Sequence, residues 1–146
     1  MSFEAPLFKP PGFTAGADLS AVQFRFVKLN GTDLQVVQAT VAGEDTLGVQ
    51  QNNPSAVGQS VSVMTAGVSK VEAGASVSIG DLITTDTVGR AIAATTGRTN
   101  TADGGAANDP LIGSFVAGTA LEAASGSGVL IAVLLDKQGA VPQTVA

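Results

Sequence analysis

The side chains of this sequence best suited to general acid–base chemistry are those of Asp and Glu. The chain has twelve Asp and Glu residues but no His and no Cys, which excludes Ser-His-Asp and Cys-His catalysis and thiolate metal sites. Paired carboxylates can still exchange protons. Six acidic residues, however, stand in turn-like stretches rich in Gly, Ala, Thr and Asn: Asp33, Asp45, Asp81, Asp86, Asp103 and Asp109. Such positions are typical of turns and solvated loops, so we expect no enzyme activity and no catalytic, cofactor or metal site.

The charge balance restricts the partners. Charged residues make up 13% of the chain and the net charge is −5, whereas nucleic-acid binding needs clustered Lys and Arg. The seven basic residues are scattered, so we expect no nucleic-acid partner. The longest apolar run, "VLIAVLL" (129–135), is far shorter than the ~20 residues of a membrane span and reads as a buried strand. The N-terminal residues lack signal-peptide features, so we expect synthesis in the cytoplasm and no membrane partner.

A lysine near a glycine-punctuated stretch offers another kind of chemistry. The string "VEAGASVSIGD" (71–81) resembles the β-barrel corner of lipoyl- and biotinyl-type carrier domains, which present a modified lysine at a tight hairpin. Lys70 would be the attachment residue, although Ser69 and Val71 replace the acidic or Met neighbours of that motif. The alternative reading is scaffold, with turns at Gly74 and Gly80. In that reading a β corner buries Val77, Ile79, Leu82 and Ile83.

The first twenty residues, "MSFEAPLFKPPGFTAGADLS", differ from the rest of the chain. They hold three of the six phenylalanines and a Pro-Pro pair, and prolines disrupt both helices and central strands. We therefore expect residues 1–20 to form an extended arm outside the sheet, with a disordered terminus as the alternative. Aromatic residues are enriched in interfaces, so the arm is a candidate for docking on a partner or a sister subunit. The candidate binding residues are Phe3, Phe8, Pro10, Pro11 and Phe13.

The remaining sequence alternates like a set of short strands. Residues 22–29 and 34–43 flank Asn30-Gly31, a strong hairpin signal. Further strands are expected in 46–53, 59–74, 76–86, 90–95, 110–128 and 129–136. A short helix in "GTALEAAS" (118–125) is an alternative, but eight residues between glycines form a marginal helix. We predict an all-β fold, a single compact β-sandwich or barrel-like domain over residues 21–136, with a long, mobile loop at 96–109 and a loose tail at 137–146.

A weak internal sequence similarity links two parts of the chain. The segment "LGVQQNNPSAVGQSVSVM" (47–64) aligns without gaps to "AGTALEAASGSGVLIAVL" (117–134). Identical residues include Gly48 with Gly118 and Gly58 with Gly128. Both segments read as strand, polar loop, Gly, strand. A duplication and a chance match in a chain rich in Gly, Ala, Ser and Val are both consistent with this pattern.

The ordered succession of these segments resembles a known family. The stretch "FVKLNGTDLQVVQATVAGEDTLGVQQNNPSAVGQSVSVMTAGVSKVEAGASVSIGD" leads into "GDLITTDTVGRAIAAT" and, after a loop, into "IGSFVAGTALEAASGSGVLIAVLL". Together they are similar to the small decoration, or cement, proteins of tailed-bacteriophage heads. The resemblance covers about residues 24–136 and rests on the order of the segments.

The resemblance implies a specific role. Proteins of that family are β-rich, commonly trimeric and non-enzymatic, and they clamp neighbouring major capsid subunits on the outside of an assembled shell. It therefore implies a homotrimer on the outer capsid surface of the virion, with the phage major capsid protein as partner and capsid stabilisation as function. The alternatives are another virion surface module, such as a tail, fibre or adhesin component, and the carrier domain described above.

Overall fold

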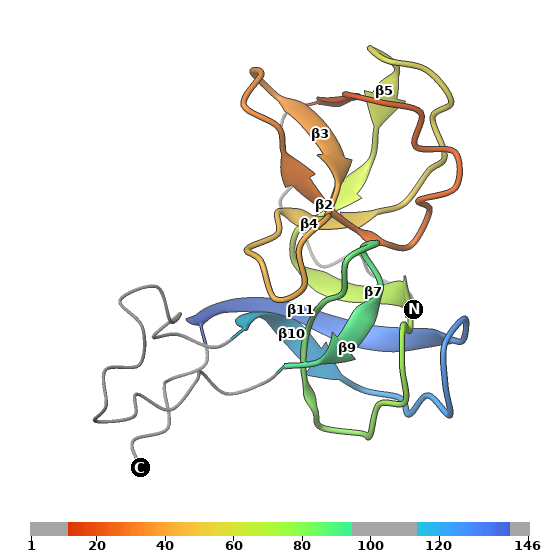
Figure 1. Cartoon of the computed structure of the whole chain (residues 1–146), viewed down its shortest axis with the longest axis vertical. Coiled ribbons are helices and arrows are strands. Elements are labelled where there is room, and N and C mark those ends of the chain that lie inside the picture. The colour runs from red at the N-terminus through yellow and green to blue at the C-terminus, as the bar shows by residue number, and fades with distance from the viewer. Residues whose placement is uncertain (1–11, 95–113, 141–146) are drawn as a thin grey trace, which may run out of the picture.

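The chain folds into two stacked β-structures (Figure 1). This computed structural model describes residues 12–94 and 114–140. Every regular element within these residues is a strand, which confirms the all-β fold class. The described residues contain no helix with the length and apolar character needed to cross a membrane.

The strands form two sheets. The first sheet has the order β5-β1-β3-β2-β4-β6, and the second has the order β7-β11-β10-β8-β9. The strand bounds are β1 (Phe13–Ala15), β2 (Phe26–Leu29), β3 (Gln35–Gln38), β4 (Gly48–Gln50), β5 (Ser60–Val61), β6 (Val63–Met64), β7 (Gly67–Glu72), β8 (Leu82–Thr85), β9 (Ala91–Ala93), β10 (Phe115–Ala120) and β11 (Leu130–Ala140).

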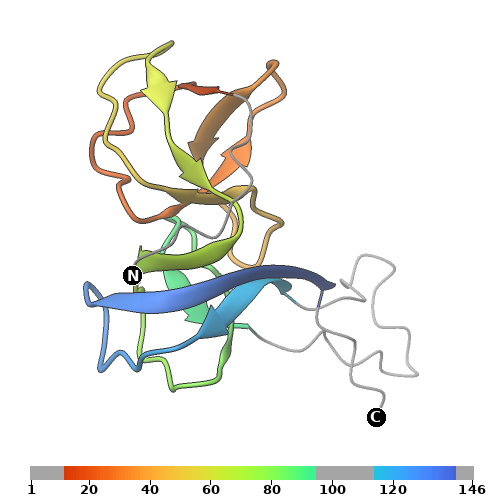
Figure 2. The same ribbon diagram turned by 180° about the vertical axis from the view of Figure 1, so that it is seen from behind.

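Each sheet curls into a small barrel. In the first sheet the two outer strands, β5 and β6, are consecutive in the chain and separated only by Ser62, so they act as one strand that closes the ring. In the second sheet an isolated parallel bridge between Ala73 and Ala91 joins the outer strands β7 and β9. We call residues 13–64 the first barrel and residues 67–140 the second barrel. Figure 2 shows the two barrels stacked end to end from behind.

The hairpin predicted at Asn30-Gly31 is confirmed. Strands β2 and β3 pair antiparallel, with Leu29 opposite Val36. Gly31 takes φ 89° and Asn30 closes the loop through its side chain, which accepts from the Thr32 N–H at 3.1 Å. The first strand begins at Phe26 rather than at residue 22 because Phe24 lies in the left-handed region at φ 61°, which interrupts the extended chain.

The internal sequence similarity between 47–64 and 117–134 corresponds to a structural repeat. Val49 pairs with Met64 in the first barrel, and Thr119 pairs with Leu134 in the second; both pairs occupy matched positions of the sequence alignment. A Cβ added to Gly48 would meet the Met64 carbonyl oxygen, and a Cβ added to Gly118 would meet the Leu134 carbonyl oxygen. The same close backbone approach therefore explains glycine at both positions.

The repeat extends to segments in which few residues match. Ala15 pairs in parallel with Val36, as Ala73 pairs with Ala91. Ala15 and Gln59 are joined by a backbone hydrogen bond of 2.8 Å, and so are the corresponding residues Ala73 and Val129. The string Ala-Gly-Ala occurs at both places, in 15–17 and 73–75. Each barrel is thus one copy of the same strand arrangement.

The copies differ most in one connection. Residues 39–47 link β3 to β4 in the first barrel, whereas residues 94–114 link β9 to β10 in the second. The predicted loop 96–109 falls inside this longer connection and lies outside the described residues. The repeat therefore places the extra length of the second copy at a single site.

Two hydrophobic clusters form the core, and one of them spans both barrels. The first barrel has an interior of its own, formed by Phe13, Ala15, Leu19, Val22, Val27, Val36, Val61 and Val63. The second cluster fills the second barrel and also includes Phe26, Ala39 and Val49 of the first. Phe26 and Val27 are neighbours in β2, yet they belong to different clusters because successive side chains point to opposite faces of a strand. One face of the first barrel thus packs against the second barrel.

The boundaries of the predicted arm and tail are wrong in part. Residues 13–15 form β1 inside the first sheet, where they pair with β3 and β5. Leu19 is fully buried as well, so the first barrel includes much of the predicted arm. At the other end β11 continues to Ala140, past the predicted start of the tail. Phe13 and Ala15 gain burial on either side of Thr14, whereas the end of β11 joins the sheet by pairing Gly139 with Val116 and Ala140 with Phe115 of β10. Residues 1–11 and 141–146 lie outside the described part.

The predicted β corner is also corrected. Val77 and Ile83 are buried as expected, but the side chains of Ile79 and Leu82 are 71% and 40% exposed. The helix considered in 118–125 does not form: β10 ends at Ala120, and Ala124 makes a bridge with Val77.

Candidate functional site

Two of the acidic residues predicted at turns, Asp81 and Asp86, act as turn formers. Asp81 accepts from the Ser78 N–H at 2.9 Å. Asp86 accepts from the Val88 and Arg90 N–H groups and forms an ion pair with Arg90 at 2.8 Å. Within residues 12–94 and 114–140 no three acidic side chains gather as metal ligands would. These carboxylates therefore close loops instead of facing a shared cavity.

Glu44 fixes the short connection between β3 and β4. Its carboxylate accepts from the N–H groups of Thr40 and Val41 at 2.7 and 3.1 Å and pairs with the Lys28 ammonium at 3.0 Å. Burial raises the pKa of Glu44, but the hydrogen bonds from these backbone groups and the neighbouring Lys28 outweigh it and leave the pKa below its ordinary value. The ionised carboxylate thus stabilises this loop.

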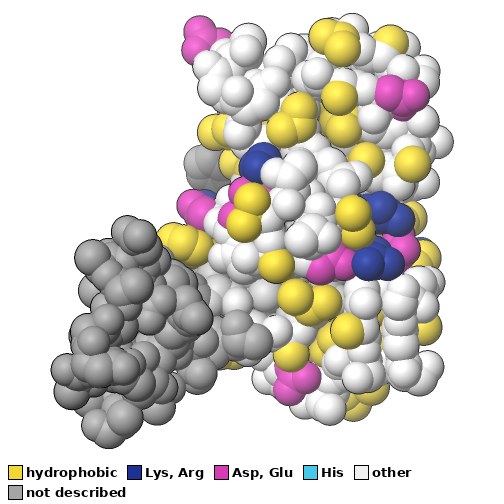
Figure 3. Space-filling view, viewed as in Figure 1, with side chains coloured by type: hydrophobic (Ala, Val, Ile, Leu, Met, Phe, Trp, Pro, Cys, Tyr) yellow, Lys and Arg dark blue, Asp and Glu magenta, His cyan; other side chains and the backbone are white. Residues whose placement is uncertain are grey.

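The junction between the barrels is fixed by polar contacts as well as by Phe26. The Arg25 guanidinium binds Glu72 through two hydrogen bonds of 2.9 and 3.2 Å, a bidentate geometry that restricts orientation. The Phe26 N–H donates to the Gly89 carbonyl at 2.7 Å, and the Glu72 N–H donates to the Phe24 carbonyl at 2.9 Å. Figure 3 shows basic and acidic side chains side by side at the level where the barrels meet. The barrels are therefore joined as one unit.

The predicted binding residues fall into two groups. Phe3, Phe8, Pro10 and Pro11 lie outside the described residues. Phe13 is 7% exposed and sits in the interior of the first barrel, opposite Val61 of β5. The prediction that Phe13 contacts a partner is wrong, because its side chain already completes a core.

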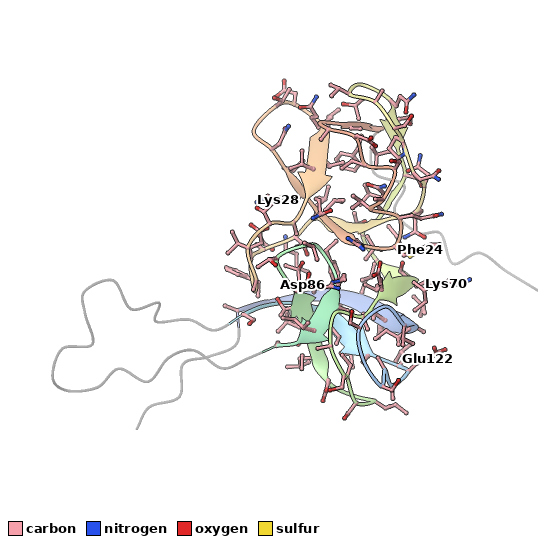
Figure 4. All side chains as sticks on the ribbon, turned by 45° about the vertical axis from the view of Figure 1, so that its right-hand side comes forward. Phe24, Lys28, Lys70, Asp86 and Glu122 are labelled. Atoms are coloured by element: carbon pink, nitrogen blue, oxygen red, sulfur yellow. The ribbon has the colours of Figure 1, made fainter. Side chains whose placement is uncertain are left out.

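Lys70 does not have the geometry of a carrier attachment site. It lies within β7, directly opposite Ala132 of β11, whereas a carrier lysine stands at a tight hairpin. Its side chain points outward from the side of the second barrel that also carries Glu122 (Figure 4). This placement favours the scaffold reading of the 71–81 stretch.

An exposed apolar row crosses the outside of the second barrel. Val68 lies opposite Leu134, Leu134 opposite Thr119, and Thr119 opposite Leu82. Directly opposed residues share a face of the sheet, so these four side chains form one line across β7, β11, β10 and β8. Val68, Leu134 and Leu82 are 54%, 41% and 40% exposed. We call these four residues the outer row.

A shallow groove adjoins the outer row. It has a volume of about 420 Å³ and is lined by Val68, Ser69, Lys70, Glu122, Leu130, Ile131 and Ala132. Lys70 and Glu122 thus place opposite charges on the same apolar groove. Exposed apolar surface of this kind is a mark of interaction sites.

Sequence reasoning missed the outer row. The run "VLIAVLL" was read as a buried strand, and only one of its faces is buried: Ile131, Val133 and Leu135 point inward, while Leu130 and Leu134 are exposed. The signal was present, because an antiparallel strand with one solvated face normally alternates apolar and polar residues. A strand that is apolar on both faces indicates a second surface to be covered.

Comparisons with known proteins find similarity at the level of the fold. No known family model matches the chain, and no curated protein matches its sequence. Among solved structures, the fold is similar to the crystal structure of the head fiber gp8.5 N base in bacteriophage phi29, with a TM-score of 0.60 and 20% sequence identity. The likeness covers 88% of this chain and 96% of that chain. It supports the two-barrel architecture over nearly the whole length of both.

Proposed function

We propose that this protein is a non-enzymatic structural component of a bacteriophage virion, held on the outer surface of the head. The observation that carries the proposal is the fold shared with a phage head fiber base across nearly the full length of both chains. The order of segments that resembles head decoration proteins points to the same part of a virion. The described carboxylates act as loop and junction contacts, which suits a scaffold.

In the finer form of this proposal, the protein clamps neighbouring major capsid subunits as a homotrimer. A protein that binds the assembled lattice and not the free subunits stabilises the lattice by mass action. Three joined copies turn modest contacts into a high avidity. Residues Phe3, Phe8, Pro10 and Pro11 are the proposed capsid contacts, since Phe13 is taken up by the first barrel.

A second role on the head is favoured by the same fold likeness. The similar structure is described as the base of a head fiber, so this chain can instead anchor an appendage without stabilising the shell. The two roles predict different effects on the capsid. A clamp raises the temperature at which heads open, whereas an anchor leaves it unchanged.

The experiment mixes purified protein with heads that lack it. We expect saturable binding at a fixed number of copies per head, measured by sedimentation and gel densitometry. A rise in the head-opening temperature, followed by dye access to DNA, assigns the clamp; saturable binding with no rise assigns the anchor. Failure to bind assembled heads, or labelling of virions at the tail alone, contradicts the proposal.

A truncation tests the proposed contact residues. Removal of residues 1–11 leaves β1 and the first barrel whole, so folding and oligomeric state serve as controls. We expect head binding to fall while both controls stay unchanged. Unchanged binding would rule out these residues as the capsid contact.

A further inference from the structure

Three residues of the outer row, Leu82, Thr119 and Leu134, have counterparts in the first barrel. Phe26 lies opposite Val49 and Val49 opposite Met64. In the structural repeat these residues match Leu82, Thr119 and Leu134, which pair in the same order. The two barrels therefore present the same outer face.

The counterpart is covered, and the outer row is open. Phe26 and Val49 are 0% exposed because this face packs against the second barrel. The corresponding Leu82 and Leu134 are 40% and 41% exposed, and both remain apolar. The fold thus already shows what this face binds when it is covered: a barrel of the same architecture.

Continuation of the stack by another first barrel is blocked. In the second barrel the surface that receives Phe26 includes Gly89, where an added Cβ would come within 2.8 Å of the Phe26 carbonyl oxygen. The matching position of the first barrel is Leu34, which precedes Gln35 as Gly89 precedes Arg90 in equivalent turns. Leu34 therefore carries a side chain at a position where the observed approach leaves no room for a Cβ. An open head-to-tail filament is therefore disfavoured.

The residues around the outer row are suited to contact with a second copy of this chain. Lys70 and Glu122 carry opposite charges on the groove beside it, and both point outward from one side of the barrel (Figure 4). In a closed ring, Lys70 of one copy can meet Glu122 of the next. Apolar residues at the centre and complementary charges at the rim are the usual anatomy of an interface.

We infer that the outer row, Val68, Leu82, Thr119 and Leu134, is the face through which copies of this chain associate into a closed homo-oligomer. The inference deepens the proposed function, since it names where the copies of the virion protein meet. Its test does not require heads, so its failure is distinct from a failure of the proposed head binding.

The test measures the mass of the full-length chain over a concentration series by light scattering and native mass spectrometry. We expect a single closed oligomer for the wild type. Leu134→Glu and Leu82→Glu place a charge in the centre of the interface, and we expect each to raise the dissociation constant by at least about 30-fold. Val57→Glu is the matched control, because Val57 is 65% exposed on the first barrel, and it should leave the mass unchanged.

Charge exchange gives a readout that a folding defect cannot imitate. Lys70→Glu and Glu122→Lys should each weaken association, and the double variant should recover it, with far-UV circular dichroism unchanged throughout. A wild type that stays monomeric at all concentrations, or Leu134→Glu and Leu82→Glu variants that remain oligomeric, would overturn the inference. Monomeric wild type combined with loss of head binding in Leu134→Glu would assign the row to the capsid instead.

Discussion

The two barrels have the same strand pairings but carry different residues at equivalent turns. Phe24 at φ 61° and Gly80 at φ 88° occupy equivalent places, since their N–H groups donate to the matched carbonyls of Gln50 and Ala120. The first barrel thus keeps a bulky residue where the second has glycine. The strand pairings thus fix the backbone conformation at this turn, and either a bulky residue or a glycine can adopt it.

Leu34 and Gly89 repeat this contrast at the hairpin turn. Leu34 lies at φ 55° and Gly89 at φ 81°. A non-glycine residue in the left-handed region costs roughly 1–2 kcal/mol. A residue with a Cβ is disfavoured at position 89, because the Phe26 carbonyl approaches Gly89 closely at the junction. The strained residue of this pair lies on the free side of the stack, whereas Phe24 lies at the junction, where its carbonyl accepts from the Glu72 N–H.

The largest effect is expected where one face is covered and its counterpart is open. Phe26→Ala removes a side chain that is 0% exposed at the junction, and we expect it to lower the free energy of unfolding by about 3–5 kcal/mol. Leu82→Ala changes the matched exposed position and, at concentrations where the chain is monomeric, should cost less than about 1 kcal/mol. Urea denaturation of both variants measures the difference, and equal losses would contradict the assignment of the covered face.

The next effect concerns the glycines at the shared close approach. Gly48→Ala and Gly118→Ala each drive a Cβ into a backbone carbonyl of the paired strand, and we expect each to cost about 2–4 kcal/mol. Gly126→Ala is the control, because a Cβ there would meet nothing within 4 Å. Thermal unfolding should show similar losses for the two glycines, as the repeat requires; a loss in one alone would break the equivalence.

A smaller effect of opposite sign is expected at the turns. Leu34→Gly relieves the left-handed strain, partly offset by the greater freedom of glycine in the unfolded chain, and should stabilise by roughly 0.5–1 kcal/mol. Gly89→Ala introduces a Cβ at positive φ beside the Phe26 carbonyl and should destabilise. Chemical denaturation of the pair tests this, and stabilisation by both would show that the turns are not equivalent.

The smallest effect is a pH dependence confined to the first barrel. The pKa of Glu44 is lowered in the folded protein, so its stabilising contribution is present above the unfolded-state pKa and is lost as the pH falls through the folded-state pKa. The residue of the second barrel that is equivalent to Lys28 is Thr84, which is buried. The second barrel therefore has no equivalent ion pair at this position. We expect Glu44→Gln to flatten the acid side of the stability profile, measured by melting temperature against pH.

Much of the strand pattern could be predicted from local sequence. The Asn30-Gly31 turn and the alternation of Val61 and Val63 with serines are signals carried by a few adjacent residues, and both are confirmed. The repeat was detectable only in 47–64 and 117–134, because glycine at the close approach restricts the sequence there. Elsewhere the copies are matched by backbone hydrogen bonds, which many side chains satisfy equally well.

The rest depended on distant contacts. Phe13 is aromatic and follows a Pro-Pro pair, so local sequence indicated an arm; its burial is set by β3 and β5, far along the chain. Leu82 looks as apolar as Phe26, and only the stacking of the barrels decides which of the two is covered. The proposed capsid contacts at Phe3, Phe8, Pro10 and Pro11 remain predictions.

Ring closure limits the ways in which neighbouring molecules can add to this protein. Each sheet joins its outermost strands, through the β5–β6 segment in one barrel and the Ala73–Ala91 bridge in the other. An open sheet edge is a template onto which any extended chain can add as a further strand. Joining the outer strands withdraws much of that template, so neighbouring molecules meet mainly through side chains and associate where those side chains match.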